Sequence, residues 1–175
     1  FYFNLIKNFI NGKPLQLAYA ANDEIKSELK DIVSKYKIDA ATVIMIRAAE
    51  NLVGVNVRKT LDYQDAISIG FARRSKSLSF PRSLLYSIES SRLAAYERYL
   101  FDVFDEKVII TEEDRKYIQH EKQSEIKIIR NGISLDYFSP DPAVAKEYDI
   151  AFVGNMTYEP NIISVKYMIE QIMPI

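Results

Sequence analysis

The chain has 175 residues and a formal net charge of -1, from 23 basic and 24 acidic side chains, a balance that argues against a nucleic-acid-binding domain. It contains no cysteine, which excludes disulfides, thiolate chemistry and zinc sites built on cysteine, and fits a cytoplasmic location. Its apolar runs all fall short of the roughly 18 residues that a membrane-spanning helix needs.

The amino-terminal segment predicts a helix that ends at Asn11 and Gly12, because its apolar residues recur at helical spacing. These residues are Phe3, Ile6, Phe9 and Ile10. The segment lacks the basic start and the cleavage site of a signal peptide, so we expect the end of a core helix. Because the chain begins without Met and stops directly after a helical pattern, we expect it to be a fragment of a longer protein.

Residues 14–19 alternate like a short extended segment, and Asn22 and Asp23 can cap a helix over 23–37. Apolar runs of strand length then alternate with helical patterns. The predicted strands cover 40–46, 55–61, 107–111, 126–129 and 149–153, and the predicted helices cover 47–52, 81–104, 112–120 and 161–173. Residues 62–79 show no clean period. This order predicts an α/β fold with a doubly wound parallel sheet, which carries helices on both faces.

The long predicted helix over 81–104 has a mixed apolar face. Its buried stripe is expected at Leu85, Ile88, Arg92, Tyr96, Tyr99 and Val103. Its acidic residues Glu89, Glu97 and Asp102 are expected in solvent. The single histidine, His120, lies at the end of a polar helix, and we expect it on the surface rather than in a functional site.

Ligands of parallel α/β sheets bind beyond the carboxyl ends of the strands, so the residues that follow the predicted strands are candidates for a site. They are Arg47, Asp62, Asp65, Thr111, Glu112, Asn131, Gly132, Gly154 and Asn155. The carboxylates of Asp62 and Asp65 can orient sugar hydroxyls or serve as acid and base. The alternative is that Asp62 is a turn residue and Asp65 caps the next helical turn.

Residues 71–82 place basic side chains among apolar ones. The basic residues are Arg73, Arg74, Lys76 and Arg82. Guanidinium groups match phosphate geometry, and the interleaved apolar residues suit a membrane interface or a lipid-linked phosphate. A solvated basic loop in front of a helix is the alternative. Gly154 at a strand end indicates either a phosphate-binding loop or a tight turn.

Familiar catalytic motifs are absent from the sequence, including the glycine-rich nucleotide loops, the GxSxG nucleophile elbow and the HExxH metal motif. A single histidine cannot build a multi-histidine metal site. The candidate chemistry therefore rests on carboxylates, arginines and backbone groups.

Residues 131–140, NGISLDYFSP, are similar to the NG(V/I)D…F.P signature that family-4 (group 1) glycosyltransferases carry between their two domains. Residues 149–161, DIAFVGNMTYEPN, resemble the first strand and loop of the carboxyl-terminal domain of that family. Residues 61–66, 96–98 and 111–112 resemble the branch found in bacterial polysaccharide clusters. The resemblance covers nearly the whole chain.

This resemblance implies a GT-B fold, in which two Rossmann-like domains face each other across a cleft. The acceptor-binding domain is expected over 1–142, without its amino-terminal part. The linker and the first strand and helix of the donor-binding domain are expected over 143–175, with Asn131 and Gly132 as the interdomain hinge. The family further implies retention of the anomeric configuration, no obligatory metal and no other cofactor.

The resemblance also implies roles for the candidate residues. Asp62 and Asp65 are expected as catalytic residues on the acceptor side, and Gly154 and Asn155 are expected near the donor diphosphate. Acceptor-binding residues are expected at Arg47, Arg73, Arg74, Thr111 and Glu112. Many members carry a His-Asp pair where this chain has Leu61 and Asp62, so the role of that histidine is absent or replaced here.

The implied partners are a nucleotide-sugar donor and a glycan or lipid-linked acceptor of polysaccharide biosynthesis. The protein is expected in the cytoplasm, with peripheral contact at the inner face of a bacterial membrane. The fragment alone is expected to transfer no sugar, and its tail is expected to dock on the first domain or to form a homodimer. Two alternatives stay open: a non-catalytic α/β module that binds a ligand or partner, and a nucleotide-sugar epimerase of the same architecture.

Overall fold

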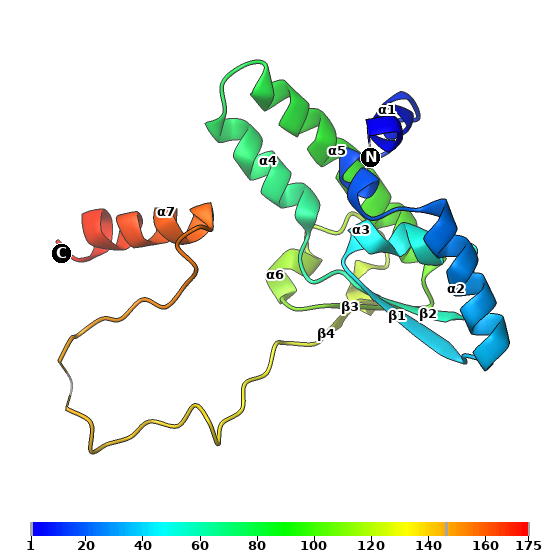
Figure 1. The fold of residues 1–175 in the computed structure, drawn as a ribbon. Helices are drawn as coiled ribbons and strands as arrows, with labels where there is room; N and C mark the ends of the chain where they lie inside the picture. The colour runs from blue at the N-terminus through cyan, green and yellow to red at the C-terminus, as the bar shows by residue number, and fades with distance from the viewer. Residues whose placement is uncertain (1, 146, 175) are drawn as a thin grey trace. The chain divides into compact units, whose positions relative to one another are not determined.

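The computed structural model describes residues 2–145 and 147–174, except for the side chains of residues 2–4, 7 and 19 (Figure 1). The chain divides into two compact units, Phe1–Gly132 and Ile133–Ile175. The division directly follows Asn131 and Gly132, which are exposed and lie outside helices and strands. It falls earlier in the chain than the predicted domain boundary after residue 142.

The first unit is built on a four-stranded sheet in which all neighbouring strands are parallel. In spatial order the strands are β1 (Ala40–Ile44), β2 (Arg58–Asp62), β3 (Glu106–Ile109) and β4 (Lys127–Ile128). The strands predicted over 40–46, 55–61, 107–111 and 126–129 are therefore confirmed, as is the α/β class with a parallel sheet. These segments are of strand length and contain β-branched residues, which favour strands.

Helices precede the sheet and connect its strands. They are α1 (Tyr2–Ile10), η1 (Leu15–Tyr19), α2 (Asp23–Tyr36), α3 (Ile46–Ala49), η2 (Glu50–Leu52), α4 (Ile67–Ser77), α5 (Arg82–Val103), α6 (Glu112–Arg115) and η3 (Gln123–Glu125). The helices predicted over 23–37 and 81–104 are confirmed as α2 and α5. Asn22 caps α2 as predicted, since its side chain accepts a hydrogen bond from the Glu24 amide at 2.8 Å.

Three segments of the first unit differ from the prediction. Residues 14–19 contain a 3₁₀ helix rather than an extended segment, and Leu17 and Ala18, adjacent in the chain, are both buried there. α4 lies within 62–79, where the sequence shows no clean period. The helix predicted over 112–120 ends at Arg115.

α1 forms as predicted, but it is not a core helix. Ile6, Phe9 and Ile10 are 61%, 54% and 75% exposed. The side chain of Phe3 lies outside the described side chains. Asn8 is buried instead, and its side-chain amide donates to the Pro14 carbonyl at 3.4 Å. Helical spacing of apolar residues therefore did not identify the face that packs.

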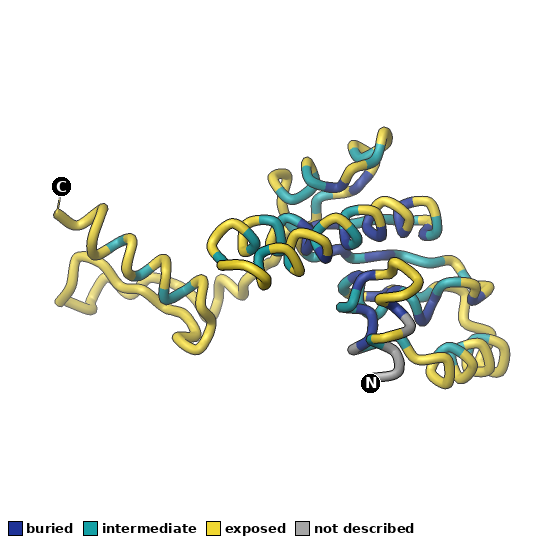
Figure 2. The backbone as a smooth tube through the Cα atoms, turned by 90° about the horizontal axis from the view of Figure 1, so that it is seen from above, coloured by how far each residue is buried: buried dark blue, intermediate teal, exposed yellow. Residues whose placement is uncertain are grey.

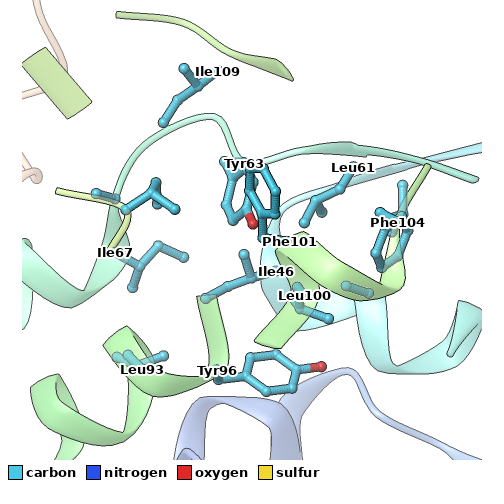
Figure 3. Packing of buried hydrophobic residues seen from close by; sticks show 14 of the residues in the cluster. Ile46, Leu61, Tyr63, Ile67, Leu93, Tyr96, Leu100, Phe101, Phe104 and Ile109 are labelled. Atoms are coloured by element: carbon cyan, nitrogen blue, oxygen red, sulfur yellow. The ribbon is translucent and has the colours of Figure 1, made fainter. Parts of the chain in front are cut away.

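The core of the first unit lies between one face of the sheet and the helices α3, α4 and α5 (Figure 3). Leu61 and Ile109 from the strands pack there with Ile46, Leu93 and Leu100, and all five side chains are fully buried. This packing positions the turns that follow the strands.

The buried stripe of α5 differs from the predicted one. It contains Glu89, Leu93, Tyr96, Glu97, Leu100 and Phe101. Leu85, Ile88 and Tyr99, predicted in the core, are exposed, whereas Glu89 and Glu97, predicted in solvent, are buried. The predicted and the observed buried residues of α5 both recur every three or four positions, so helical spacing alone does not distinguish them. The prediction assumed that acidic side chains face solvent, and this assumption is wrong for Glu89 and Glu97.

Among the described residues, the helices cover only one face of this sheet (Figure 1). Leu61 and Ile109 point toward the helices, whereas on the opposite face Thr42 and Arg58 are exposed and Ile44 is 60% exposed. The order β1-β2-β3-β4 explains this, because right-handed crossovers that all step in one direction place their helices on one face. The prediction of helices on both faces is therefore not met in this part of the chain.

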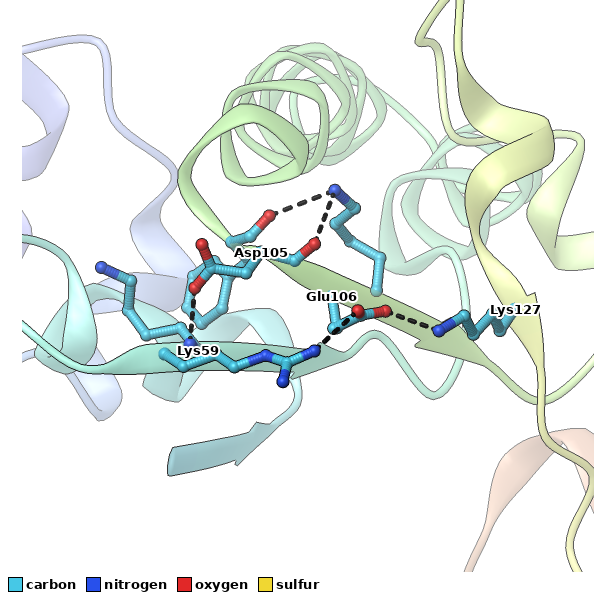
Figure 4. Close-up of polar contacts among 7 residues, drawn as sticks. Lys59, Asp105, Glu106 and Lys127 are labelled. Atoms are coloured by element: carbon cyan, nitrogen blue, oxygen red, sulfur yellow. Dashed lines mark hydrogen bonds and ion pairs between the residues drawn. The ribbon is translucent and has the colours of Figure 1, made fainter. Parts of the chain in front are cut away.

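Paired charges hold the amino ends of the strands together (Figure 4). The Glu106 carboxylate lies 3.1 Å from the Arg58 guanidinium and 2.7 Å from the Lys127 ammonium. The hydrogen bond from Lys127 is the main cause that lowers the pKa of Glu106. Asp105 accepts a hydrogen bond from the Lys59 amide at 2.7 Å, which lowers the pKa of Asp105. These charges satisfy one another.

The second unit contains α7 (Glu159–Tyr167), which continues as η4 (Met168–Ile172). The helix predicted over 161–173 is therefore confirmed, but the strand predicted over 149–153 is wrong. Ile150 and Val153 in that segment are 52% and 95% exposed. Figure 2 colours the described chain between the first unit and α7 as exposed. A strand needs hydrogen bonds to a neighbouring strand, and no described segment of the second unit supplies one.

Candidate functional site

Asp62 ends β2 and shapes the turn that follows. Its carboxylate accepts hydrogen bonds from the backbone amide of Gln64 at 2.9 Å and from the side-chain amide of Gln64 at 2.6 Å. Gln64 has a φ of 64°, a left-handed conformation that is uncommon for residues other than glycine. The contacts of Asp62 therefore agree with the alternative in which it holds a turn.

Asp65 lies in the same turn but faces other charges. α4 begins after Ala66, which supplies no side-chain cap. Asp65 is an exposed residue, but its carboxylate loses part of its hydration, and this loss and the negative charge of Asp114 raise the pKa of Asp65, while the positive charge of Arg47 offsets part of that rise. Asp65 is therefore the member of the predicted carboxylate pair that faces side chains from other turns.

Arg47 reaches this edge from the turn after β1. Met45 has a φ of 70°, a strained conformation for a residue with a side chain, and its amide donates to the Asp62 carbonyl at 2.8 Å. This bond joins the ends of β1 and β2 and sets the start of α3, which carries Arg47. The Nε of Arg47 is buried and has no hydrogen-bond partner among the described residues, which is uncommon for a charged donor.

Thr111 and Glu112 follow β3 and take part in the short helix α6. The Thr111 hydroxyl accepts a hydrogen bond from the Asp114 amide at 3.0 Å, as an N-cap does, and donates to the Asp114 carboxylate. Glu112 pairs with Arg115 at 2.5 Å. Asp114, which the strand pattern alone did not indicate, is held in this way in the first turn of α6, and its negative charge acts on Asp65. The signal for Asp114 is the capping pattern of a threonine followed by an acidic residue three positions later.

Arg47, Asp65 and Asp114 thus come from the turns after three neighbouring strands and converge at the carboxyl edge of the sheet. Two negative charges face one positive charge here, whereas the charges at the amino edge pair with one another. Carboxylates in such a group can accept hydrogen bonds from a hydroxyl-rich ligand, and the guanidinium can hold an anionic group.

A buried glutamate from α5 supports this edge. Glu97 is 0% exposed, and its carboxylate accepts hydrogen bonds from the Ser68 amide at 3.0 Å and the Ser68 hydroxyl at 2.6 Å. These bonds satisfy the first turn of α4, directly after the turn that carries Asp65. Burial raises the pKa of Glu97 to about 7, against the opposing effect of the Ser68 bonds. The signal for its burial is its place between Leu93 and Leu100 in an apolar stripe.

His120 has a structural environment rather than the exposed one that we predicted. Its side chain is 10% exposed and stacks on the Phe101 ring, with 3.8 Å between the ring centroids. The Lys122 amide donates to Nδ1 at 3.0 Å, so the neutral ring carries its proton on Nε2, which lies 3.1 Å from the Asp102 carboxylate. A surface cavity of about 410 Å³, also lined by Arg98, lies beside this ring. His120 thus joins the segment after α6 to α5.

Arg73 and Arg74 lie on α4, which packs against α5 as the α4–α5 hairpin. The Arg73 guanidinium lies 3.4 Å from the Tyr117 hydroxyl and 5.7 Å from the centroid of that ring. Arg74 lies 5.9 Å from the centroid of the Tyr86 ring. Both arginines therefore pack against aromatic rings. They belong to the hairpin and not to the group of Arg47, Asp65 and Asp114 at the carboxyl edge of the sheet.

Gly154 and Asn155 form a turn in front of α7 in the second unit. The Asn155 side chain accepts hydrogen bonds from the amide and the hydroxyl of Thr157, at 2.9 and 2.8 Å. The side-chain amide of Asn161 donates to the Asn155 carbonyl at 3.0 Å. A Cβ on Gly154 would lie 2.8 Å from the Nδ2 atom of Asn161, so any other residue here would displace that side chain.

Across the residues that the structure describes, no three His, Asp or Glu side chains come together in a way that could hold a metal ion. None of the described helices combines the length and apolar character of a membrane span. Comparison of this chain with protein-family models, with curated proteins and with solved structures gives no match. Its function is therefore inferred from the side chains at the sheet edge and from the motif at the division between the units.

Proposed function

We propose that this chain forms the acceptor-binding part, and begins the donor-binding part, of a retaining glycosyltransferase with a GT-B fold. The reaction moves a sugar from a nucleotide-sugar donor to a glycan or lipid-linked acceptor in polysaccharide biosynthesis. The observation that carries the proposal is the convergence of Arg47, Asp65 and Asp114 at the carboxyl edge of a parallel sheet. That edge is where the ligands of such sheets bind.

In this proposal Asp65 accepts the hydrogen bond of the acceptor hydroxyl that attacks the sugar. Its raised pKa brings it closer to neutral pH, which suits a group that handles a proton. Arg47, whose Nε lacks a protein partner, holds an anionic group of the acceptor, such as the phosphate of a lipid-linked glycan. Asp62 and Glu97 act indirectly, because they hold the two ends of the turn that carries Asp65.

Two features support a donor-binding part in the second unit. The turn at Gly154 and Asn155 lies in front of α7, and the amino end of a helix favours a diphosphate through its free amides and its dipole. The motif over 131–140, similar to the linker of family-4 glycosyltransferases, begins where the two units divide.

The test is sugar transfer by the full-length protein, with labelled UDP- and GDP-sugars as donors and a membrane lipid extract as the source of acceptors. Asp65→Asn keeps the shape of the side chain and removes its charge. We expect the transfer rate to fall by roughly 10²-fold, the usual size of a lost proton-transfer or orienting group, with donor binding unchanged. Asp39→Asn is the matched control, because Asp39 is exposed directly before β1 at the opposite edge of the sheet.

Three results would count against the proposal. Wild-type transfer by Asp65→Asn would remove Asp65 from the reaction. Interconversion of the sugar nucleotide without any acceptor would indicate an epimerase. Binding of a ligand with no transfer under any donor would favour a non-catalytic module.

A further inference from the structure

The outer end of the α4–α5 hairpin differs in charge from the chain as a whole. The 23 residues between Asp65 and Glu89 contain no acidic residue, although the chain carries a net charge of -1. Basic residues in this stretch are Arg73, Arg74, Lys76 and Arg82, and all four are exposed. A local positive excess on a nearly neutral chain attracts an anionic partner.

The same end of the hairpin exposes large apolar side chains. Phe80, in the loop that joins the two helices, is 78% exposed, and Leu84 and Leu85 in the first turns of α5 are 53% and 47% exposed. From Ile69 to Ile88 no residue of the hairpin is buried. Three large apolar side chains exposed between residues 80 and 85 favour an interaction surface at this end of the hairpin. We call residues 76–85 the hairpin tip.

Helix packing carries the tip out from the core. At the base of the hairpin Glu97 caps α4, and the Ser90 hydroxyl donates to the Ser68 carbonyl at 2.9 Å. Farther out, the rings of Phe71 and Tyr86 stack with 5.2 Å between their centroids. The loop that joins α4 to α5 lies at the end of the hairpin away from the sheet (Figure 1). The inner faces of both helices are thus occupied by each other, and the side chains of the tip are available to a partner.

We propose that the hairpin tip docks on an anionic lipid surface. Phe80 and Leu84 enter the headgroup region, and Lys76 and Arg82 contact the lipid phosphates. Basic and apolar side chains on one short surface are the feature of proteins that lie on a membrane, since the charges attract anionic lipids and the apolar groups leave water. A nucleic-acid duplex would use the charges through its phosphates but would leave Phe80 and Leu84 in water. This proposal is independent of the reaction assigned above.

The test is co-flotation of the full chain with vesicles of one part phosphatidylglycerol to two parts phosphatidylcholine, against vesicles of phosphatidylcholine alone. We expect binding to the anionic vesicles that weakens in half-molar salt, because salt screens exposed charges. Lys76→Gln with Arg82→Gln should weaken binding by roughly 25-fold, at about fivefold for each charge near the surface. Phe80→Ser should weaken it by roughly tenfold, through the loss of apolar burial.

Matched controls lie on exposed positions elsewhere in the first unit. Lys30→Gln with Lys35→Gln on α2 removes the same charge, and Ile10→Ser on α1 removes a side chain that is 75% exposed. We expect both controls to bind as the wild-type chain does. Circular dichroism should show all variants folded, because every substituted residue is exposed.

Five outcomes would overturn the proposal. Four concern binding: no binding of the wild-type chain to anionic vesicles, equal binding to phosphatidylcholine alone, wild-type binding by the tip variants, and tighter binding to a single-stranded RNA oligonucleotide than to vesicles. A dimer in solution that Phe80→Ser dissociates would also overturn it, since the tip would then be an interface between two copies.

Discussion

Replacing Glu97 by glutamine tests whether a buried carboxylate supports the candidate site. Glutamine has nearly the shape of glutamate, so its carbonyl can accept the hydrogen bond of the Ser68 amide and its amide can donate to the Ser68 hydroxyl. The cap of α4 is therefore kept in Glu97→Gln, and only the ability to ionise is lost. Any change in pH dependence then reports the charge of Glu97.

The expected magnitude follows from the pKa of Glu97. Folding raises this pKa from an ordinary value of 4.5 to about 7, mainly because the carboxylate loses its hydration. The folded chain then holds a proton that the unfolded chain has released, so the contribution of Glu97 to stability is fully present below about pH 4.5 and is lost as the pH rises to about 7. The difference corresponds to about 3 kcal/mol, at about 1.4 kcal/mol for each pH unit.

Urea unfolding, followed by far-ultraviolet circular dichroism from about pH 5 to about pH 8, measures this effect. Between these limits we expect Glu97→Gln to gain stability relative to the wild-type chain, by up to about 3 kcal/mol at the upper end. Subtracting the unfolding free energy of the wild-type chain from that of Glu97→Gln at each pH removes most of the effect of the other titrating groups, because both proteins contain them. Glu28→Gln, at an exposed position of α2, should show no such trend. A difference between Glu97→Gln and wild type that stays constant with pH would refute the reasoning.

Two further predictions concern local structure. The buried Asn51 side chain donates to the Ala20 carbonyl at 2.8 Å and accepts from the Asn22 amide at 2.9 Å, directly before α2. We expect Asn51→Ala to lower the free energy of urea unfolding by about 2 kcal/mol, because both backbone groups lose their partner. Asn56→Ala, at an exposed position, should lower it little. Gly154→Ala places a Cβ within 2.8 Å of the Asn161 side chain. We expect amide hydrogen exchange in the turn before α7 to become roughly tenfold faster in this variant. Gly132→Ala, where a Cβ meets open space, should leave amide exchange in the turn before α7 unchanged. Equal exchange rates in the two glycine variants would contradict the close packing of the turn.

Local patterns were sufficient to predict most elements of the first unit. The run before Arg47 indicated a strand because it is apolar, of strand length and contains β-branched residues, and Asn22 indicated the start of α2 because its side chain satisfies a free helix amide. These signals act over a few residues, so they do not depend on where the rest of the chain lies.

Predictions failed where burial depended on a distant partner. The stripe of α5 was assigned with Leu85 inside and Glu97 outside, although both patterns have helical spacing. Glu97 is buried because Ser68, 29 residues away, supplies two hydrogen-bond donors. The strand predicted over 149–153 failed for a related reason, since its composition suits a strand but no described neighbour pairs with it.

For the candidate site, the sequence alone determined which residue types follow the strands, and hence that Asp62, Asp65 and Arg47 would lie at one edge of a parallel sheet. Only the tertiary structure decided how they differ there. The Asp62 carboxylate is occupied by a turn, whereas Asp65 faces Arg47 and Asp114, which belong to turns far along the chain. The physical reason is that strand composition is a local property, whereas the direction and charge environment of a side chain depend on neighbours that only folding brings close.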